Sequence, residues 1–418
     1  MQQIDGTTGH GGASLGDAFN PFHGPQLADP YPFYARLRAE EPVFYSPMLR
    51  MWYVTRHDDI VAVLRDTARF SSIDAINMPL DYTEETRRVA QTLFLSERTL
   101  VDNDPPAHTS IRRMVSRAFT QRMATMEPRV QAIATRLIDG FAAQGQVEAI
   151  SGFCFPMPMR VILDLLGAPG DDMALLKRWA DDWMTHISFQ QTPEQQAATI
   201  GRLVDSQGYW TELIAARRAD PRDDLLSDII AAAATEQTPV NNLQLVNLCS
   251  ALVLAGHETT SHALGHCLHR LLRDREQWQL VLDDPANIPR AFEEALRADT
   301  SVQALMRTTL VPVEVGGVTI PQGAKVAVLF ASGSHDAAYY ADAARFDLRR
   351  EATKTHLAFG HGVHFCLGAP LARMEGRIAL ELLSRRLPGL RLAEQEITYI
   401  ANPLFRWLQA LHIAWDVP

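Results

Sequence analysis

Cysteine is scarce in this chain of 418 residues, which contains only Cys154, Cys249, Cys267 and Cys366. The four show neither C-x-x-C spacing nor the density of a disulfide scaffold, so a small secreted fold held together by disulfides is excluded. At least one of them is therefore a candidate ligand or nucleophile.

Long apolar runs are missing too. No window of about 18 uninterrupted apolar residues offers a membrane span, and the opening MQQIDGTTGHGGASLGDAFN lacks the basic and apolar regions of a signal peptide. We expect a flexible tail over 1–20 and, because no Pro/Gly/Ser-rich linker interrupts the rest, a single domain over 21–418. These features predict a soluble, cytoplasmic monomer with no membrane partner.

Positive charge is in deficit, with 39 Lys and Arg against 49 Asp and Glu and a net charge of -10. A surface that follows phosphates normally needs clustered excess cations, so general nucleic-acid binding is excluded, although local basic patches remain possible. Hydrophobic residues make up 47% of the chain, enough for a substantial core.

Periodicity predicts a mainly α protein with small β-sheets, an α+β fold class. Residues 42–56 are rich in aromatic and β-branched residues and predict a hairpin, while helical patterns dominate 105–296. The longest predicted helix covers 242–273, about 48 Å at about 1.5 Å per residue. Short strands follow, including a hairpin over 313–320 that turns at its glycine pair.

The stretch AGHETTSHAL, residues 255–264, places a glutamate and two threonines inside this longest helix. It resembles the zinc motif H-E-x-x-H, but His257 and His262 lie roughly 140° apart around a helix, so one metal ion cannot readily take both. Buried polar groups without partners cost about 1–3 kcal/mol each. The stretch therefore indicates a functional role rather than a merely irregular helix.

The segment AFGHGVHFCLGAPLAR, residues 358–373, presents one cysteine in a glycine-rich loop before a helix predicted to begin near Leu367. The helix N-terminus and backbone N–H groups favour a thiolate there, and the glycines permit close approach to a flat ligand. A zinc site at His361, His364 and Cys366 would lack a fourth ligand nearby. The residues that fit F-x-x-G-x-[HR]-x-C-x-G are Phe359, Gly362, His364, Cys366 and Gly368.

On these residues the sequence resembles the cytochrome P450 family of soluble bacterial type. DPPAHTSIRR, the E-x-x-R pair and [AG]-G-x-[DE]-T agree with it in order along nearly the whole chain. The resemblance implies a single-domain fold with haem b (iron protoporphyrin IX) between the long central helix and the helix after the cysteine loop. Cys366 is then the iron ligand, and the implied haem contacts are His108, Arg112, Ala255, Gly256, Arg307, Phe359, Gly360, His364, Cys366 and Gly368.

The E-x-x-R pair is Glu294 and Arg297, which lie one helical turn apart and can meet on one face. Such a pair is usually a solvated one. The resemblance implies a buried structural network instead, completed by Arg345 in the Arg-Phe-Asp segment.

The resemblance makes Glu258 and Thr259 catalytic, with Thr259 hydrogen-bonding the dioxygen ligand and Glu258 relaying protons. His257 is expected to be a supporting or outward-facing residue. The implied function is a haem-thiolate monooxygenase that inserts one atom of dioxygen into a lipophilic small molecule, by hydroxylation or epoxidation. Electrons would come from NAD(P)H through ferredoxin reductase and ferredoxin. A haem-thiolate peroxygenase or isomerase, and a haem-dependent sensor, are the alternatives.

The resemblance also implies two surfaces. Arg113 with Arg117, and Arg373 with Arg377, are spaced i, i+4 and would attract an acidic ferredoxin. The substrate is expected to contact separated segments that together form a mainly apolar pocket, with Gln303 as a polar anchor. These contacts are Leu95, Ser96, Leu100, Ala251, Leu254, Val302, Gln303, Leu404 and Phe405.

Overall fold

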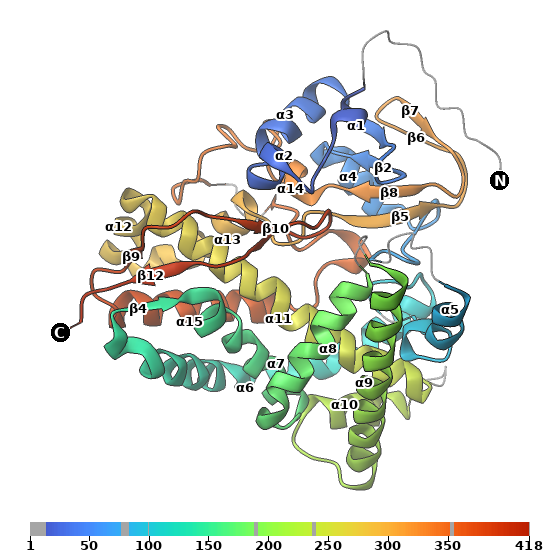
Figure 1. Ribbon diagram of the computed structural model, residues 1–418, viewed down its shortest axis with the longest axis horizontal. Helices are drawn as coiled ribbons and strands as arrows, with labels where there is room; N and C mark the ends of the chain where they lie inside the picture. The colour runs from blue at the N-terminus through green and yellow to red at the C-terminus, as the bar shows by residue number, and fades with distance from the viewer. Residues whose placement is uncertain are drawn as a thin grey trace.

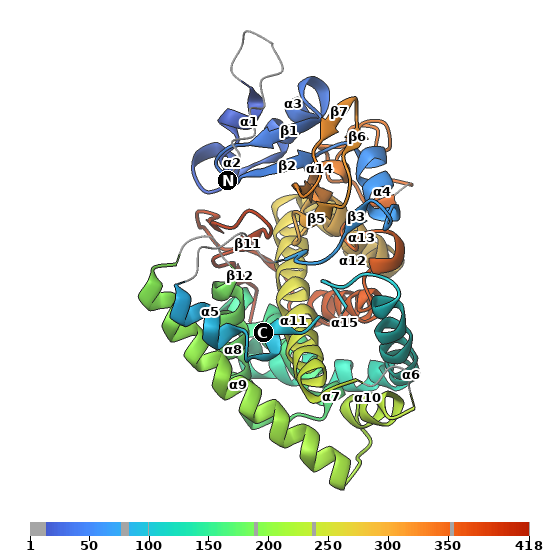
Figure 2. The ribbon, with the colours of Figure 1, turned by 90° about the vertical axis from the view of Figure 1, so that its right-hand side faces the viewer.

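The computed structural model describes residues 14–76, 83–98, 100–187, 191–235, 240–351 and 355–417. Helices form most of the regular structure, and Figures 1 and 2 show β1, β2, β5 and β8 lying beyond one end of the helical body. The predicted mainly α architecture with small sheets is confirmed. Among the described residues, no helix combines the length and apolar character needed to cross a bilayer.

The α-helices span a wide range of lengths, and the longest are α6, α9 and α11. They are α1 (Leu15–Ala18), α2 (Gly24–Ala28), α3 (Tyr31–Glu40), α4 (His57–Arg65), α5 (Glu84–Ala90), α6 (Ala107–Phe141), α7 (Pro156–Leu166), α8 (Met173–His186), α9 (Pro193–Ala219), α10 (Leu225–Ala233), α11 (Asn242–Arg273), α12 (Arg275–Asp283), α13 (Ile288–Ala298), α14 (Phe330–Gly333) and α15 (Ala369–Arg386).

The strands are all short. They are β1 (Val43–Ser46), β2 (Met51–Val54), β3 (Phe70–Ser71), β4 (Gln146–Glu148), β5 (Leu305–Thr309), β6 (Val313–Val315), β7 (Val318–Ile320), β8 (Lys325–Val328), β9 (Arg391–Leu392), β10 (Tyr399–Ile400), β11 (Trp407–Leu408) and β12 (His412–Ala414).

The largest sheet has the order β1-β2-β8-β5-β3. The hairpin predicted over 42–56 is the antiparallel pair β1–β2, and β2 continues the sheet by pairing in parallel with β8. The hairpin predicted over 313–320 is β6–β7, with Gly316 and Gly317 at positive φ values of 55° and 80°. Positive φ at both turn positions of β6–β7 suits the right-handed twist of its strands. Because both antiparallel pairs are present, both hairpin predictions are confirmed.

Helix α11 is the axis of the helical body and has the bounds predicted from the sequence. Asn241 caps its start through a reciprocal pair of hydrogen bonds with Gln244. It packs against α7, α9, α13 and α15, so most of its surface is buried, and Figure 2 shows it running through the centre of the molecule. The stretch 255–264 therefore lies near the middle of the domain.

Residues 14–20 belong to the fold, which corrects the predicted tail over 1–20. The Ser14 hydroxyl accepts a hydrogen bond from the Gly16 N–H at the start of α1. Phe19 is 1% exposed and packs edge-on against Tyr53, with ring centroids 4.9 Å apart. One buried aromatic ring is enough to fix this segment, because it removes a large apolar area from water. Residues 1–13 lie outside the described residues.

The buried network around Glu294 also differs from the prediction. Glu294 and Arg297 are both 0% exposed, and two guanidinium nitrogens of Arg297 donate to the carboxylate at 2.8 and 2.7 Å. The further arginine is Arg350, whose Nε donates to Glu294 Oε1 at 3.2 Å. The backbone carbonyl of Arg345 accepts hydrogen bonds from Arg297 and Arg350, and Arg345 as a whole is exposed. The assignment of Arg345 as the completing side chain is therefore wrong.

We predict that Arg350→Met destabilises the protein by about 1–3 kcal/mol, because Glu294 loses a charged donor in a buried site. Arg345→Met is the matched control and should change the free energy of unfolding by less than about 0.5 kcal/mol. Urea denaturation followed by circular dichroism measures both. Equal losses in the two variants would restore the role of the Arg345 side chain.

Candidate active site

The cysteine loop connects the turn at Gly362–His364 to α15. The Cys366 N–H donates to the Phe359 carbonyl at 2.9 Å, which closes the loop on itself. Gly360 and Gly362 have positive φ values of 68° and 73°, and a Cβ at Gly362 would lie 3.0 Å from the carbonyl oxygen of Leu64. Glycine is thus required where the loop presses against the end of α4.

Opposing effects act on the Cys366 thiol. Burial raises its pKa, while the backbone N–H groups of Gly368 and Ala369 and the positive charges of Arg112 and Arg373 lower it. Burial is the largest effect, so the thiolate that the helix N-terminus was expected to favour is stabilised only in part. A bound metal ion completes the deprotonation of such a ligand.

His108 and His364 form a histidine pair beside this loop. Their ring centroids lie 4.0 Å apart, and both ring nitrogens of the buried His108 lack a hydrogen-bond partner among the described residues. His364 is held by the Ser72 hydroxyl at 2.9 Å and the Leu100 carbonyl at 3.0 Å. Burial lowers the pKa of His364 to about 3, so that ring is neutral near pH 7. Within the pair, the ring nitrogens left to hydrogen-bond a ligand are therefore those of His108.

Arg112 and Arg307 bring positive charge to the same region. Arg307 is buried on β5, and burial lowers its pKa to about 10, which still leaves the guanidinium charged near pH 7. Arg112 donates to the Phe365 carbonyl at 2.7 Å and so reaches the cysteine loop from α6. Both charges act on His108 and lower its pKa after the larger effect of burial. A buried and a partly exposed guanidinium beside unpartnered ring nitrogens suit a ligand that carries carboxylates.

Near its middle, α11 has one face that is not covered by other side chains. Ala255 is exposed although most of the helix is buried, and the half-buried Thr259 donates its hydroxyl to the Ala255 carbonyl at 2.9 Å. A Cβ at Gly256 would lie 3.0 Å from Ile162 Cγ1, so the missing side chain allows α7 to pack closely. A hydroxyl and an exposed alanine therefore share one turn.

Glu258, by contrast, contacts neighbouring protein groups and is 6% exposed. Its Oε1 lies 3.0 Å from Nε2 of His257 and 3.5 Å from Nζ of Lys177 on α8, and its Oε2 lies 3.8 Å from Nε2 of His262. Burial raises the pKa of Glu258, but the hydrogen bond and charge of His257, followed by Lys177 and His262, lower it to about 2. The carboxylate is therefore ionised. His257 is 0% exposed, so it supports Glu258 and does not face outward.

Lys177 was missed by sequence reasoning. It stands four residues before Asp181, with which it pairs, and this spacing predicts a solvated ion pair on one helix face. Only the packing of α8 against α11 brings its ammonium to Glu258. No spacing within the sequence signals that contact.

The residues predicted to contact substrate fall into two groups. The first follows α5 and is tied to α11 where Asn247 donates to the Glu97 carbonyl at 2.7 Å. The second is a pairing of two late segments: Val302 bridges Phe405, and the Gln303 N–H donates to the Leu404 carbonyl at 2.7 Å. The first group comprises Leu95, Ser96 and Leu100 with Ala251 and Leu254 on α11, and the second comprises Val302, Gln303, Leu404 and Phe405.

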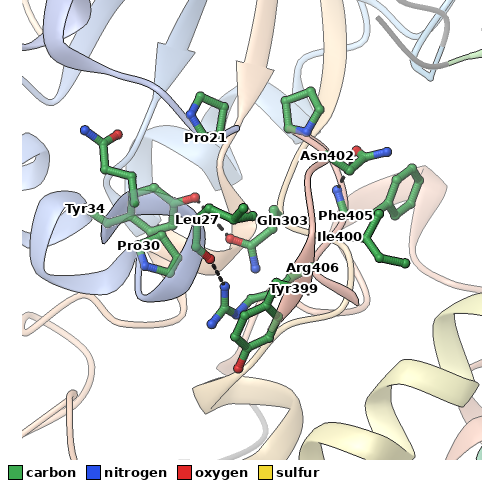
Figure 3. A pocket seen from close by; sticks show the side chains of 12 residues that line it. Pro21, Leu27, Pro30, Tyr34, Gln303, Tyr399, Ile400, Asn402, Phe405 and Arg406 are labelled. Atoms are coloured by element: carbon green, nitrogen blue, oxygen red, sulfur yellow. Dashed lines mark hydrogen bonds between the residues drawn. The ribbon is translucent and has the colours of Figure 1, made fainter. Parts of the chain in front are cut away.

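Gln303 is not a free polar anchor. Its Oε1 accepts from the Tyr34 hydroxyl at 3.1 Å, and its Nε2 donates to the Thr300 carbonyl at 2.8 Å. Figure 3 shows the side chain directed toward Tyr34 in a cavity that Tyr399 and Arg406 also line. That cavity holds about 20 Å³, room for about one water molecule, so it is not the substrate pocket.

The donor set fits the haem expected from the sequence. A thiol is presented in a glycine loop before α15, and cationic groups with an unpartnered histidine lie beside it, where haem carboxylates need partners. Among the described residues, no group of three or more His, Cys, Asp or Glu side chains could hold a metal ion. A zinc cluster at His361, His364 and Cys366 is therefore not formed.

Comparisons with known proteins identify the family. The cytochrome P450 family model matches residues 44–281 and 288–387. The chain is 35% identical to cytochrome P450 monooxygenase PikC of Streptomyces venezuelae, over 93% of this chain and 91% of that protein. It is 34% identical to vitamin D(3) 25-hydroxylase of Pseudonocardia autotrophica, over 94% of this chain and 95% of that protein.

Among solved structures, cytochrome P450 CREJ in complex with (4-ethylphenyl) dihydrogen phosphate superposes with a TM-score of 0.90 at 30% identity, covering 96% of this chain and 100% of that chain. Family membership implies haem b and the incorporation of oxygen into a substrate. The chain therefore belongs to the cytochrome P450 family and is a haem-containing monooxygenase.

Proposed function

We propose that this monooxygenase hydroxylates or epoxidises a lipophilic small molecule, using electrons that pass from NAD(P)H through a ferredoxin. The observation that carries the proposal is the turn of α11 that holds ionised Glu258 on its buried side and Thr259 beside exposed Ala255. An acid and an alcohol at adjacent positions can move protons from one side of the helix to the other. Proton delivery of this kind is what dioxygen cleavage requires.

In this proposal a haem would be held between α11 and α15 and would supply dioxygen activation at a thiolate-ligated iron. Cys366 would provide the thiolate ligand. The side chains of Arg112, Arg307 and His108 would hold the carboxylates, and His364 would contribute by packing against the His108 ring. The remaining contacts are backbone or apolar ones, from Ala255, Gly256, Phe359, Gly360 and Gly368.

Replacement of Cys366 by histidine tests the ligand. We predict that the purified protein binds one haem b and that its ferrous carbon monoxide complex shows the red-shifted Soret band of thiolate ligation. Cys366→His should abolish that band, because a neutral imidazole donates less electron density than a thiolate. Visible absorption spectra measure it, and Cys249→Ser, at another buried cysteine, serves as the control. A red-shifted band that survives in Cys366→His would contradict the assignment.

Glu258 and Thr259 divide the proton transfer between them. Glu258 can take a proton on the side where the partly exposed Lys177 contacts it. Thr259 faces the open side, where its hydroxyl can donate to a ligand in place of the Ala255 carbonyl. The proton path therefore joins two adjacent positions of α11, at a turn that Gly256 loosens.

We predict that Thr259→Ala still binds haem, substrate and dioxygen but loses coupling. NADH consumption should persist while product per NADH falls and hydrogen peroxide rises. The reason is that the variant lacks the hydroxyl that would deliver a proton during dioxygen cleavage. Glu258→Gln should slow turnover by up to about 10²-fold and enlarge the solvent isotope effect, since it removes the titratable group. Steady-state assays with saturating substrate measure both.

Thr260→Ala is the control for this test, since Thr260 is the buried neighbour on the same turn. Normal coupling in Thr259→Ala, together with unchanged turnover in Glu258→Gln, would show that Glu258 and Thr259 have a structural role and do not transfer protons. Activity that needs only hydrogen peroxide would instead support a peroxygenase.

A lipophilic substrate follows from the side chains proposed to surround it. Leu95, Leu100 and Leu254 are apolar, as are the paired Val302 and Phe405. Gln303 no longer supplies a polar contact, because its amide is bonded within the protein. Terpenoid, steroid, fatty-acid and aromatic compounds are suitable probes, and binding is read from a shift of the Soret band.

The ferredoxin is proposed to dock on α6. Arg113 and Arg117 are exposed near the end of this helix from which Arg112 reaches the cysteine loop. In the second expected pair, Arg373 is bound to Glu293, and Arg377 to Glu127 and Glu381. The exposed Arg117 on α6 is therefore the position chosen to test docking.

We predict that Arg117→Glu slows reduction by an acidic ferredoxin at least about tenfold at low ionic strength, and that added salt reduces the difference. Stopped-flow reduction measures the rate. Arg178→Glu, at an exposed arginine on α8, makes the same change in net charge and should leave the rate unaltered. Equal effects of the two substitutions would show that only the overall charge matters.

A further inference from the structure

His257 has no role in the proposed function, although it touches the proposed proton relay. It is 0% exposed, and Phe155 packs edge-on against its ring with centroids 5.5 Å apart. Its Nδ1 lies 2.6 Å from the Val253 carbonyl oxygen, and its Nε2 lies 3.0 Å from Oε1 of Glu258. Both ring nitrogens are thus engaged, one by the backbone and the other by the carboxylate.

These two contacts fix how many protons the pair holds. A carbonyl oxygen only accepts, so Nδ1 of His257 carries a hydrogen. If Nε2 carried no hydrogen and the carboxylate were ionised, both atoms would be hydrogen-bond acceptors and their lone pairs would repel each other. Their contact is a hydrogen bond only when one transferable proton lies between them. The pair is therefore either imidazolium with carboxylate or imidazole with carboxylic acid.

The charges around the pair decide between the two forms. Lys177, itself paired with Asp181, approaches one carboxylate oxygen of Glu258, and His262 approaches the other. The Lys177 ammonium, 3.5 Å from Oε1 of Glu258, favours the ionised form of this carboxylate. Burial lowers the pKa of His262 to about 3, so that ring is neutral and brings no proton. With the carboxylate ionised, the contact at Nε2 of His257 is a hydrogen bond only when that nitrogen carries the proton.

We propose that His257 stores the proton that Glu258 passes toward Thr259, an inference that rests on the proposed relay function of Glu258. In the step, the N–H bond at Nε2 of His257 breaks as an O–H bond forms at Oε1 of Glu258. Glu258 then passes a proton toward the Thr259 hydroxyl. Its carboxylate then accepts a proton from solvent on the Lys177 side and returns it to His257. His257 acts through Glu258 and is a positioning residue.

The stored proton can be read directly in nitrogen-15 spectra of histidine-labelled holoenzyme in the diamagnetic ferrous carbon monoxide form. His257, identified by the signals lost in a His257 variant, should show two protonated ring nitrogens near neutral pH. In Glu258→Gln the amide can donate to Nε2, so the same ring should be protonated on Nδ1 alone. A wild-type His257 ring protonated only on Nδ1 would overturn the proposal.

Two substitutions separate proton storage from simple hydrogen bonding. His257→Asn can keep the bond to the Val253 carbonyl, and His257→Gln can keep a donor toward Glu258, but neither holds a transferable proton. Both should slow substrate-saturated turnover on the order of tenfold and enlarge the solvent isotope effect. The loss is smaller than the about 10²–10⁴-fold of full acid–base catalysis, because solvent can still protonate Glu258. Wild-type turnover in His257→Gln would make His257 a structural donor and overturn the proposal.

His262→Asn is the matched control, since it removes a neutral histidine beside the same carboxylate, and it should keep the wild-type isotope effect. If Glu258→Gln slows turnover while both His257 variants behave as wild type, the relay stands and proton storage is wrong. If Glu258→Gln also has no effect, the proposed function of Glu258 is wrong. Should the His257 variants fail to take up haem, comparison of the wild-type and Glu258→Gln spectra decides.

Discussion

The rest of this structure depends on one constraint: a helix at the centre of the domain must carry charge without leaving it unpaired. Removing a carboxylate from water costs several kcal/mol unless hydrogen bonds and opposite charges replace the solvent. Glu258 meets that condition with His257 from its own helix and Lys177 from α8. The position of α8 against α11 is therefore an electrostatic requirement as much as a packing one. An ionised acid in the middle of α11 is possible only in the assembled fold.

The same turn shows how one helix separates two environments. His257 and Glu258 face protein, whereas Ala255 and Thr259 face open space. Adjacent positions on an α-helix point about 100° apart, so a pair of neighbours can join the two sides without a gap in the chain. Gly256 lets α7 approach closely at this point, and the Thr259 hydroxyl bonds back to a carbonyl. The first feature adapts the helix to close packing with α7, and the second satisfies a hydroxyl on its exposed face.

How far the sequence predicts the molecule depends on whether a feature is local. The bounds of α11 follow from its capping box and apolar period, the hairpin β1–β2 from its aromatic and β-branched residues, and the hairpin β6–β7 from its glycine turn. The cysteine loop is readable because its glycines and its ligand are contiguous. The network around Glu294 is not: Arg345 and Arg350 stand five residues apart in one irregular segment, and only its path through space decides which guanidinium points inward. The amide of Gln303 was misassigned for the same reason, since Tyr34 is distant in the sequence.

A second buried carboxylate extends the constraint to the proposed substrate wall. Asp299 receives hydrogen bonds from the Tyr31 hydroxyl at 3.0 Å and from the Nε atoms of Arg270 and Arg406 at 3.2 and 2.8 Å. Burial raises its pKa, but the charges of His266, Arg270 and Arg406 bring it well below its usual range. Arg406 adjoins Phe405, and Arg270 lies near the end of α11, so a single ionised group fixes the late segment against the central helix. The position proposed for Phe405 beside a substrate therefore depends on an ion-pair network around Asp299.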